Sequence, residues 1–216
     1  MKHLCVAGGG AALAQPVIKH YLQEGWRVTA VCHVAKPSPE LVALYPNLLR
    51  AEYAYPMTEQ VDLLVTMCGR ACAGTLENVH GDDWSQTLQS NLTEVFKALK
   101  YTELVDGANV VVVGSIQAKN GYGCTPYAAA KAGLEGLVRG AALEWARRSI
   151  RVNLLELGYV AAGMGKALPD NAKDRALKGI PLGRFGTPDE VLHAVRFLAE
   201  TTYMTGNTLT LAGGMR

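Results

Sequence analysis

Hydrophobic positions follow two alternating spacings along most of the chain. Short runs of apolar and β-branched residues predict strands, and the continuous runs among them are typical of strands buried on both faces of a parallel sheet. Between these runs, apolar residues recur at the three- and four-residue spacing of amphipathic helices. Strands are expected at residues 3–7, 27–34, 47–53, 61–67, 108–113, 150–155 and 207–211, and helices at 12–24, 82–104, 126–148, 166–178 and 188–200.

This alternation of strands and helices predicts an α/β fold. We expect a Rossmann-type doubly wound parallel sheet of about seven strands, with helices on both faces. A chain of 216 residues is suited to a single domain, 1–216. Prolines punctuate the stretch from about 35 to 60, which leaves room for only a short helix region between the third and fourth strands.

Three consecutive glycines, Gly8, Gly9 and Gly10, separate the first strand from the first helix. A strand, a glycine turn, a helix and a second strand form a βαβ unit of the size that binds a dinucleotide phosphate at the helix N-terminus. A flexible turn without a ligand explains the same glycines about equally well. The turn alone therefore does not identify a cofactor site.

The stretch from Ser115 to Lys131 contains the clearest candidate chemistry. Ser115 ends an apolar strand, and Tyr127 and Lys131 lie four residues apart in the following helix, so they project from one face of that helix. A hydroxyl, a phenol and an ammonium that converge where a strand ends can hold a carbonyl or an alcohol and move a proton to or from it.

The long helix expected over 82–104 contains a further polar residue, Asn91. Asp82 or Asp83 is expected to cap this helix, and Trp84 and Phe96 belong to its apolar stripe. Periodicity alone favours a solvated surface position for Asn91.

Composition and charge narrow the class of protein. Hydrophobic residues make up 49% of the chain, charged residues 19%, and the net charge is +2, without a dense cluster of Lys or Arg. This pattern argues against nucleic acid and anionic membrane as partners. No apolar run approaches the roughly 20 residues of a membrane span. Five scattered cysteines predict reduced thiols in a cytoplasmic protein and no metal site.

Four ordered stretches resemble the short-chain dehydrogenase/reductase family, most closely the subgroup that includes 3-oxoacyl-carrier-protein reductases. Ser115 with Y-A-A-A-K at 127–131 resembles the family's Ser…Y-x-x-x-K signature, and Asn91 lies in a segment similar to the family's active-site helix. The stretches S-I-R-V-N at 149–153 and P-L-G-R-F-G-T-P at 181–188 resemble the strand and the C-terminal run of that family. The resemblance covers nearly the whole chain.

The resemblance implies a catalytic set of Asn91, Ser115, Tyr127 and Lys131. Tyr127 would be the proton donor in reduction, and Lys131 would lower its pKa and hold the nicotinamide ribose. Ser115 would bind the carbonyl oxygen of the substrate, and Asn91 would hold a water that links Lys131 to solvent. The implied function is an NAD(P)(H)-dependent ketoreductase.

A nicotinamide cofactor is implied as well, with contacts in the glycine turn and at the ends of several strands. NADP(H) is expected rather than NAD(H), because strand 27–34 ends without an acidic residue while His33 and Lys36 can accept a 2′-phosphate. Solvated loop polarity explains these two residues nearly as well. The implied cofactor-binding residues are Gly8, Gly10, Leu13, His33, Gly69, Tyr127, Lys131, Gly158 and Val160.

Departures from the family pattern lie almost entirely on the cofactor side. Ala14 stands where the family has the last glycine of its turn, Thr66-Met67-Cys68 replaces N-N-A, and Leu157 and Ala162 replace a proline and a threonine. An alternative function is therefore a binding or regulatory protein that retains the fold with weak or no catalysis.

The substrate and the assembly follow from the resemblance only in outline. The substrate is expected to be a small-molecule carbonyl or alcohol, free or carrier-bound, near Gln117, Tyr122 and Tyr159. Residues 159–180 are expected to form a substrate lid. The two long helices are expected to assemble a homotetramer or a homodimer.

Overall fold

Seven parallel strands form one sheet in the computed structural model of the chain, which describes residues 1–32, 48–52, 57–71, 74–121 and 124–216. The strand order is β3-β2-β1-β4-β5-β6-β7, so the winding reverses between β1 and β4. These strands are β1 (His3–Ala7), β2 (Arg27–Cys32), β3 (Leu48–Glu52), β4 (Met57–Thr66), β5 (Thr102–Ser115), β6 (Arg151–Leu157) and β7 (Thr208–Leu211). The expected doubly wound parallel sheet is confirmed.

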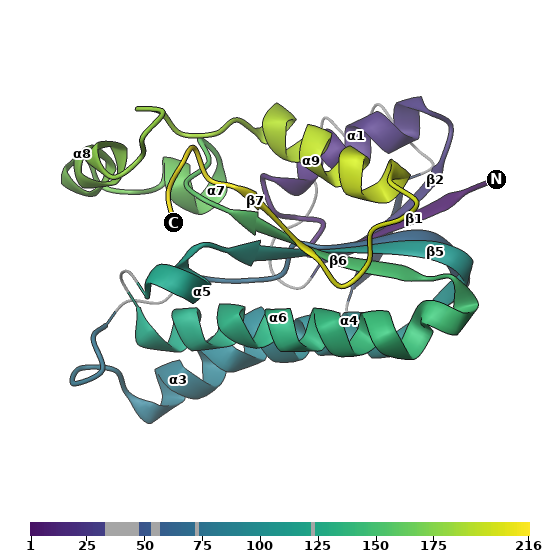
Figure 1. Cartoon of the computed structure of the whole chain (residues 1–216), viewed down its shortest axis with the longest axis horizontal. Coiled ribbons are helices and arrows are strands. Elements are labelled where there is room, and N and C mark those ends of the chain that lie inside the picture. Colours follow the sequence, from purple (N-terminus) through teal and green to yellow (C-terminus); the bar gives the residue numbers. More distant parts are fainter. Residues whose placement is uncertain (33–47, 53–56, 72–73, 122–123) are drawn as a thin grey trace.

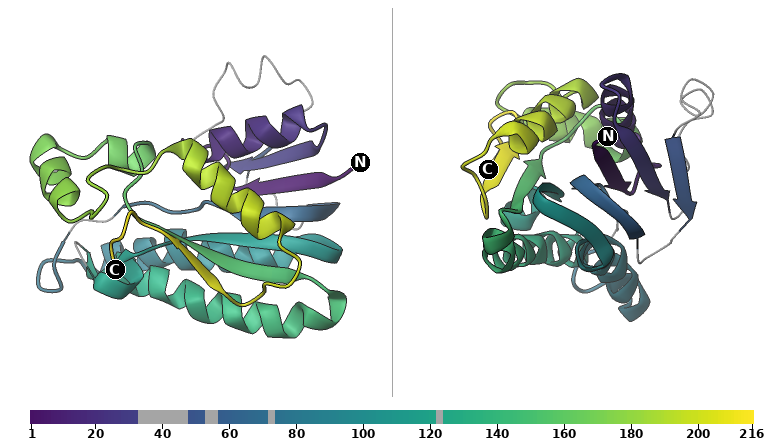
Figure 2. Two further views of the ribbon diagram at one scale, coloured as in Figure 1. Left: turned by 45° about the horizontal axis from the view of Figure 1, so that its top comes forward. Right: turned by 90° about the vertical axis from the view of Figure 1, so that its right-hand side faces the viewer.

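Helices cover both faces of this sheet (Figure 1). One layer contains α1 (Ala14–Gln23) and α9 (Pro188–Glu200), and the opposite layer contains α4 (Glu94–Tyr101) and α6 (Thr125–Trp145). The π-helical turn η1 (Gln89–Thr93) joins α3 (Gly81–Leu88) to α4, and the 3-10 turn η2 (Ala146–Arg148) follows α6. Three short helices, α5 (Gln117–Asn120), α7 (Gly163–Lys166) and α8 (Asp170–Lys178), lie at the end where the strands terminate (Figure 2).

Two apolar clusters, one on each face of the sheet, form the core. Successive side chains of a strand point to opposite faces. In β1, Leu4 and Val6 accordingly pack toward α1 and α9, while Cys5 packs toward α4 and α6. All three side chains are fully buried. Because both faces are covered, the strands consist of the continuous apolar runs that made them recognisable in the sequence.

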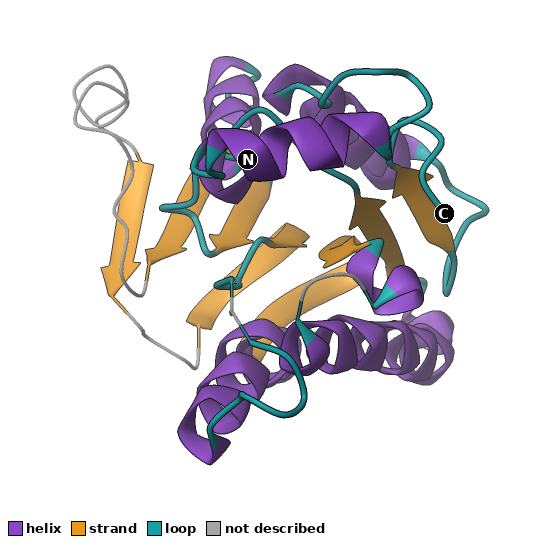
Figure 3. Cartoon of the chain, turned by 90° about the vertical axis from the view of Figure 1, so that its left-hand side faces the viewer, coloured by secondary structure: helices purple, strands orange, loops and turns teal. Residues whose placement is uncertain are grey.

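The carboxyl ends of the central strands meet at one edge of the sheet, onto which Figure 3 looks. Ala7 at the end of β1 pairs with Thr66 at the end of β4. Ser115 at the end of β5 pairs with Leu157 at the end of β6. The loops that follow these four strands therefore begin side by side, at the place where α/β sheets bind ligands.

The long helix expected over 82–104 differs from the structure in four respects. It ends at Tyr101, because Thr102 already belongs to β5, and it is interrupted by the π-helical turn. His80 is the N-cap, so the expected cap at Asp82 or Asp83 is wrong, although both carboxylates lie in the first turn, where the helix dipole favours them. Trp84 and Phe96 are partly exposed and do not belong to the buried stripe.

Other predicted elements agree with the structure to within a few residues. The helix expected at 188–200 is confirmed as α9, and it begins at a capping box formed by Thr187 and Glu190. The helix expected at 166–178 is divided into α7 and α8, and α5 was not predicted. Of the stretch from 35 to 60, residues 33–47 and 53–56 lie outside the described residues, and only 53–56 separate β3 from β4. In the described part of the chain, no helix combines the length and apolarity that crossing a membrane requires.

Candidate active site

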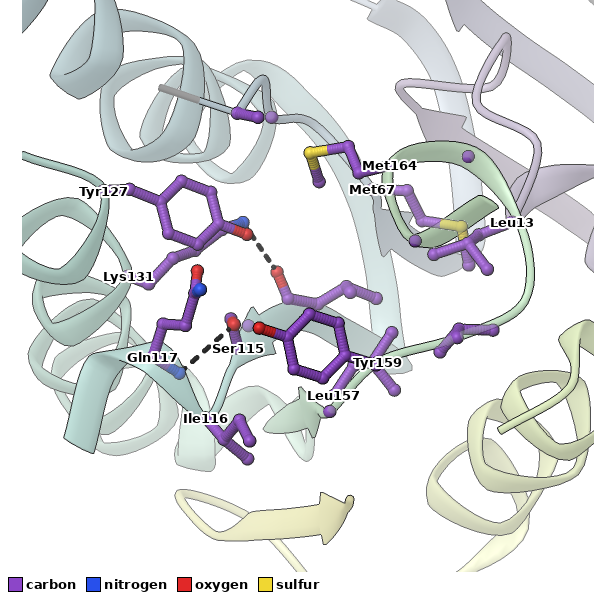
Figure 4. Close-up of a pocket in the computed structure, with 18 of the residues that line it drawn as sticks. Leu13, Met67, Ser115, Ile116, Gln117, Tyr127, Lys131, Leu157, Tyr159 and Met164 are labelled. Atoms are coloured by element: carbon purple, nitrogen blue, oxygen red, sulfur yellow. Dashed lines mark hydrogen bonds between the residues drawn. The ribbon is translucent and has the colours of Figure 1, made fainter. Parts of the chain in front are cut away.

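Helix α6 places Tyr127 and Lys131 at the edge where the strands end. The helix begins directly after Cys124, which has extended backbone, and Pro126 lies in its first turn, where its missing N–H costs no intrahelical bond. Tyr127 and Lys131 are both buried members of this helix, one turn apart. Figure 4 shows both side chains projecting from α6 toward Ser115 at the end of β5.

The Lys131 ammonium is almost completely buried, with 4% of the residue exposed. Its Nζ donates hydrogen bonds to the backbone carbonyl oxygens of Cys68, at 3.4 Å, and Val113, at 3.3 Å. Nζ also lies 5.6 Å from the centroid of the Tyr127 ring. Burial lowers the pKa of Lys131 from 10.5 to about 8, and the Cys68 thiol opposes this shift weakly.

The Tyr127 phenol is buried and hydrogen-bonded to Ser115. Burial raises the pKa of Tyr127 above its ordinary value of 10.0, and the hydrogen bond with Ser115 partly offsets that rise. The sequence led us to expect a pKa lowered by Lys131, and this expectation is wrong for the chain described here, because desolvation of the phenolate is the larger effect. A phenol with a raised pKa remains protonated at neutral pH.

Asn91 lies in the π-helical turn and is fully buried, not solvated as periodicity alone favoured. A wider turn of this kind frequently occurs at functional sites. Its Nδ2 donates to the carbonyl oxygens of Arg70, at 3.1 Å, and Thr87, at 3.0 Å. Its Oδ1 is buried and has no hydrogen-bond partner among the residues that the structure describes.

Gly69 lies between Asn91 and Lys131. A Cβ at Gly69 would lie 2.5 Å from Asn91 Oδ1 and 3.4 Å from Lys131 Nζ, so a side chain here would collide with the Asn91 amide, and only glycine fits. A water molecule bound at Asn91 Oδ1 would give this buried acceptor a partner, and a buried polar atom without one is costly.

A cavity of about 530 Å³ connects this set to the glycine turn. Leu13 and Ala12 line one part of it, and Ser115, Tyr127 and Lys131 line another. Its volume lies within the range of small-molecule and cofactor sites. Lys131 is the one charged side chain among the described residues that line the cavity.

The structure brings together most of the residues predicted for the site. Besides Ser115, Tyr127 and Lys131, the cavity is lined by Leu13, Gly69, Gly158, Val160, Gln117 and Tyr159, whereas Asn91 is fully buried and is not among the lining residues. Gly8 and Gly10 belong to the turn and are not among the lining residues. Gly8 has a φ of +82°, and a Cβ at this position would lie 2.7 Å from the Met67 backbone. His33 and Tyr122 lie outside the described residues.

Sequence reasoning missed several lining residues, among them Ile116, Asn120 and Met215. Ile116 and Asn120 belong to or adjoin the unpredicted helix α5, and Met215 is distant in sequence, so no periodic pattern marked them. Cys124, another lining residue, is disulfide-bonded, which corrects the expectation that all cysteines are reduced. Within the described ranges, no group of three or more His, Cys, Asp or Glu side chains could hold a metal ion.

Several known proteins are similar to this chain in sequence. A family model described as enoyl-(acyl carrier protein) reductase matches residues 51–216. The 3-oxoacyl-[acyl-carrier-protein] reductase FabG of Chlamydia pneumoniae is 38% identical over 163 residues, which cover 72% of this chain and 66% of that protein. The corresponding protein of Chlamydia muridarum is 34% identical over 183 residues, which cover 82% of this chain and 72% of that protein.

Among solved structures, a short-chain dehydrogenase/reductase from Serratia marcescens BCRC 10948 is similar over the full length. Its TM-score is 0.85 at 25% identity, and the match covers 99% of this chain and 97% of that one.

Burial of Lys131 leads to a prediction about stability. A pKa lowered from 10.5 to about 8 means that the folded state binds the proton less tightly than the unfolded state does. Below pH 8, this difference lowers the free energy of unfolding by about 3 kcal/mol. The variant Lys131→Met should therefore unfold at higher urea concentration than the wild type at pH 7. The difference should shrink as the pH rises from about 8 toward 10.5, where the unfolded state also loses its proton.

Urea denaturation followed by circular dichroism at pH 7 and pH 9.5 measures this difference. Lys19→Met, which removes an exposed lysine on α1, is the matched control and should change the midpoint little at either pH. A Lys131→Met protein that is less stable than the wild type at pH 7 would contradict the prediction.

Proposed function

The chain belongs to the short-chain dehydrogenase/reductase family, and on that premise we propose that it is an NAD(P)(H)-dependent ketoreductase with Tyr127 as the proton donor. The observation that carries this proposal is that Ser115, Tyr127 and Lys131 line one cavity that also reaches the glycine turn, with Asn91 buried against Gly69, which lines the cavity too. A protein with only a binding role has no need of all four groups in this arrangement.

The cavity supports a nicotinamide cofactor by its shape and its polar atoms. At Gly8 and Gly69 the backbone lies too close to its neighbours for a Cβ, so the two glycines allow the glycine turn and the segment after β4 to pack together beside the cavity. Leu13, the N-cap of α1, lines the cavity and contributes no side-chain hydrogen bond there, so a phosphate can approach the helix N-terminus. Gly158 and Val160 line the same cavity, and Lys131 would bind the ribose. When bound, the cofactor supplies the hydride.

Tyr127 and Ser115 would act on the carbonyl oxygen of the substrate. The two side chains share a hydrogen bond, so one oxygen atom can accept hydrogen bonds from both hydroxyls. During reduction, the phenol gives its proton to this oxygen and becomes a phenolate. The raised pKa of Tyr127 keeps the proton on the phenol until the developing negative charge on the oxygen draws it away.

Lys131 and Asn91 would restore the proton to Tyr127. The ammonium beside the ring stabilises the phenolate and can return a proton to it. A water bound at Asn91 Oδ1 would then take a proton from solvent and pass one to Lys131. This relay gives the unpartnered Oδ1 atom a role that packing alone does not give it.

The remaining walls favour a neutral substrate. Met164 and Leu168, in the predicted lid 159–180, and Met215 contribute apolar surface, and Gln117 and Tyr159 contribute polar atoms. We propose a small-molecule carbonyl with an apolar substituent, free or carrier-bound, reduced in the cytoplasm. We also propose that the chain forms a homotetramer or a homodimer through the two long helices expected at 82–104 and 126–148.

NADPH should bind more tightly than NADH, by about tenfold, because His33 and Lys36 can contact a 2′-phosphate with charge-assisted hydrogen bonds. Energy transfer from the three tryptophans to the reduced nicotinamide measures both dissociation constants. His33→Ala should weaken NADPH binding and leave NADH binding nearly unchanged. Absence of saturable binding for either dinucleotide would contradict the enzymatic function.

Tyr127→Phe should lower kcat for carbonyl reduction by at least about a hundredfold, because the proton donor is lost while the ring remains. NADPH binding should be preserved, which separates loss of chemistry from loss of the cofactor site. Tyr203→Phe, which alters a fully exposed tyrosine, is the matched control and should retain full activity. Equal turnover by Tyr127→Phe and the wild type would show that another group donates the proton.

The pH dependence of reduction should reflect Lys131. Because its pKa is about 8, the ammonium is lost as the pH rises through 8, and kcat/KM should decline above that pH. Lys131→Arg retains a positive charge across this range, so any activity it keeps should decline only at higher pH. A wild-type profile that is flat from pH 7 to pH 10 would contradict the assignment.

A further inference from the structure

A buried carboxylate lies directly behind the substrate side of the cavity. Glu156 is the penultimate residue of β6, and only 1% of it is exposed. Its Oε2 accepts hydrogen bonds from Lys119 Nζ, at 2.7 Å, and from Thr210 Oγ1, at 3.0 Å. A buried carboxylate is costly unless it is paired and hydrogen-bonded, so this cluster is expected to hold a defined geometry.

Lys119 connects Glu156 to the short helix α5. The helix is a single turn of four residues between Ser115 and Gly121, and a turn of this length has little stability of its own. Gln117 and Asn120, at its two ends, line the cavity, whereas Lys119 does not. The lysine side chain therefore ties α5 to the sheet, while its neighbours in the same turn form part of the cavity wall.

The same tie lies next to Ser115 in the sheet. Gly114 pairs with Glu156, and Ser115 pairs with Leu157. A Cβ at Gly114 would lie 3.7 Å from Glu156 Cγ, so the glutamate packs against the backbone that precedes Ser115. The Ile116 amide donates to the Leu157 carbonyl at 3.0 Å, and the Gln117 amide donates to Ser115 Oγ at 3.3 Å. A shift of α5 would therefore move the Ser115 hydroxyl.

We propose that Lys119 and Glu156 are positioning residues: their ion pair, braced by Thr210, fixes α5 and thereby aims the Ser115 hydroxyl at the carbonyl oxygen. This inference rests on the proposed ketoreductase function and names a determinant of that site outside the cavity itself. The Lys119 side chain is half-exposed, whereas the Glu156 side chain is buried. The lysine can therefore be replaced without changing the packing of the core.

Lys119→Met tests the proposal, because methionine keeps the apolar stem of the side chain and removes the charge. We expect kcat for carbonyl reduction to fall about tenfold to a hundredfold, the effect of a small misplacement of a catalytic group, with KM and the NADPH dissociation constant changed much less. Glu156→Gln should show a smaller loss of kcat, since an amide oxygen can still accept from both partners. Arg27→Met is the matched control, because it removes a different ion pair, between Arg27 of β2 and Glu59 of β4, near the opposite ends of the strands.

A double-mutant cycle separates positioning from general damage. In a Ser115→Ala background, Lys119→Met should cause no further loss of kcat, because the hydroxyl it positions is already absent. A full additional loss in that background would overturn the proposal, as would an unchanged kcat in the single variant.

A second readout does not depend on turnover. Hydrogen exchange of the amides of residues 116–121 should be at least several-fold faster in Lys119→Met than in the wild type or Arg27→Met. If the wild type reduces no carbonyl substrate, the ketoreductase function fails, and this exchange measurement still decides the role of the ion pair. Unchanged exchange in residues 116–121 would overturn the proposed anchor of α5 whatever the activity.

Discussion

The burial of one ammonium group is the constraint on which the site depends. Lys131 is enclosed by α6, the end of β5 and the segment after β4, and its hydrogen bonds are with backbone carbonyl oxygens instead of carboxylates. A buried lysine without a carboxylate partner retains a mobile proton near neutral pH, which a salt-bridged lysine would not. Burying this ammonium lowers the free energy of unfolding. The two apolar clusters on either side of the sheet stabilise the fold enough to tolerate this loss.

Much of the fold could be predicted because the sheet is covered on both faces. Continuous apolar runs such as that of β4 are then recognisable as buried strands. Pro126 and the Thr187 capping box mark the starts of α6 and α9. The π-helical turn around Asn91 could not be predicted, since helical periodicity continues through it. The length of α4 was overestimated for a similar reason: Leu104 continues the helical spacing and yet belongs to β5.

The candidate site was partly predictable, and its misses have physical causes. Ser115, Tyr127 and Lys131 were found because they lie at one strand end and on one helical face. The direction of the Tyr127 pKa was missed because desolvation depends on burial, which sequence spacing does not report. Asn120 and Met215 were missed because a single helical turn and a distant segment of the chain leave no periodic signal.

The segment from Thr66 to Gly69 illustrates how a binding site tolerates divergence in its sequence. Only the glycine agrees with the family pattern there, and the structure offers a reason. Cys68 contributes its backbone carbonyl to Lys131, and every amino acid has that carbonyl. Gly69 contributes a backbone without a Cβ, which lets it lie against Asn91, and only one amino acid has such a backbone. Selection at such a site acts on the position of the main chain and on the absence of one carbon atom, so the neighbouring side chains can change while the chemistry stays the same.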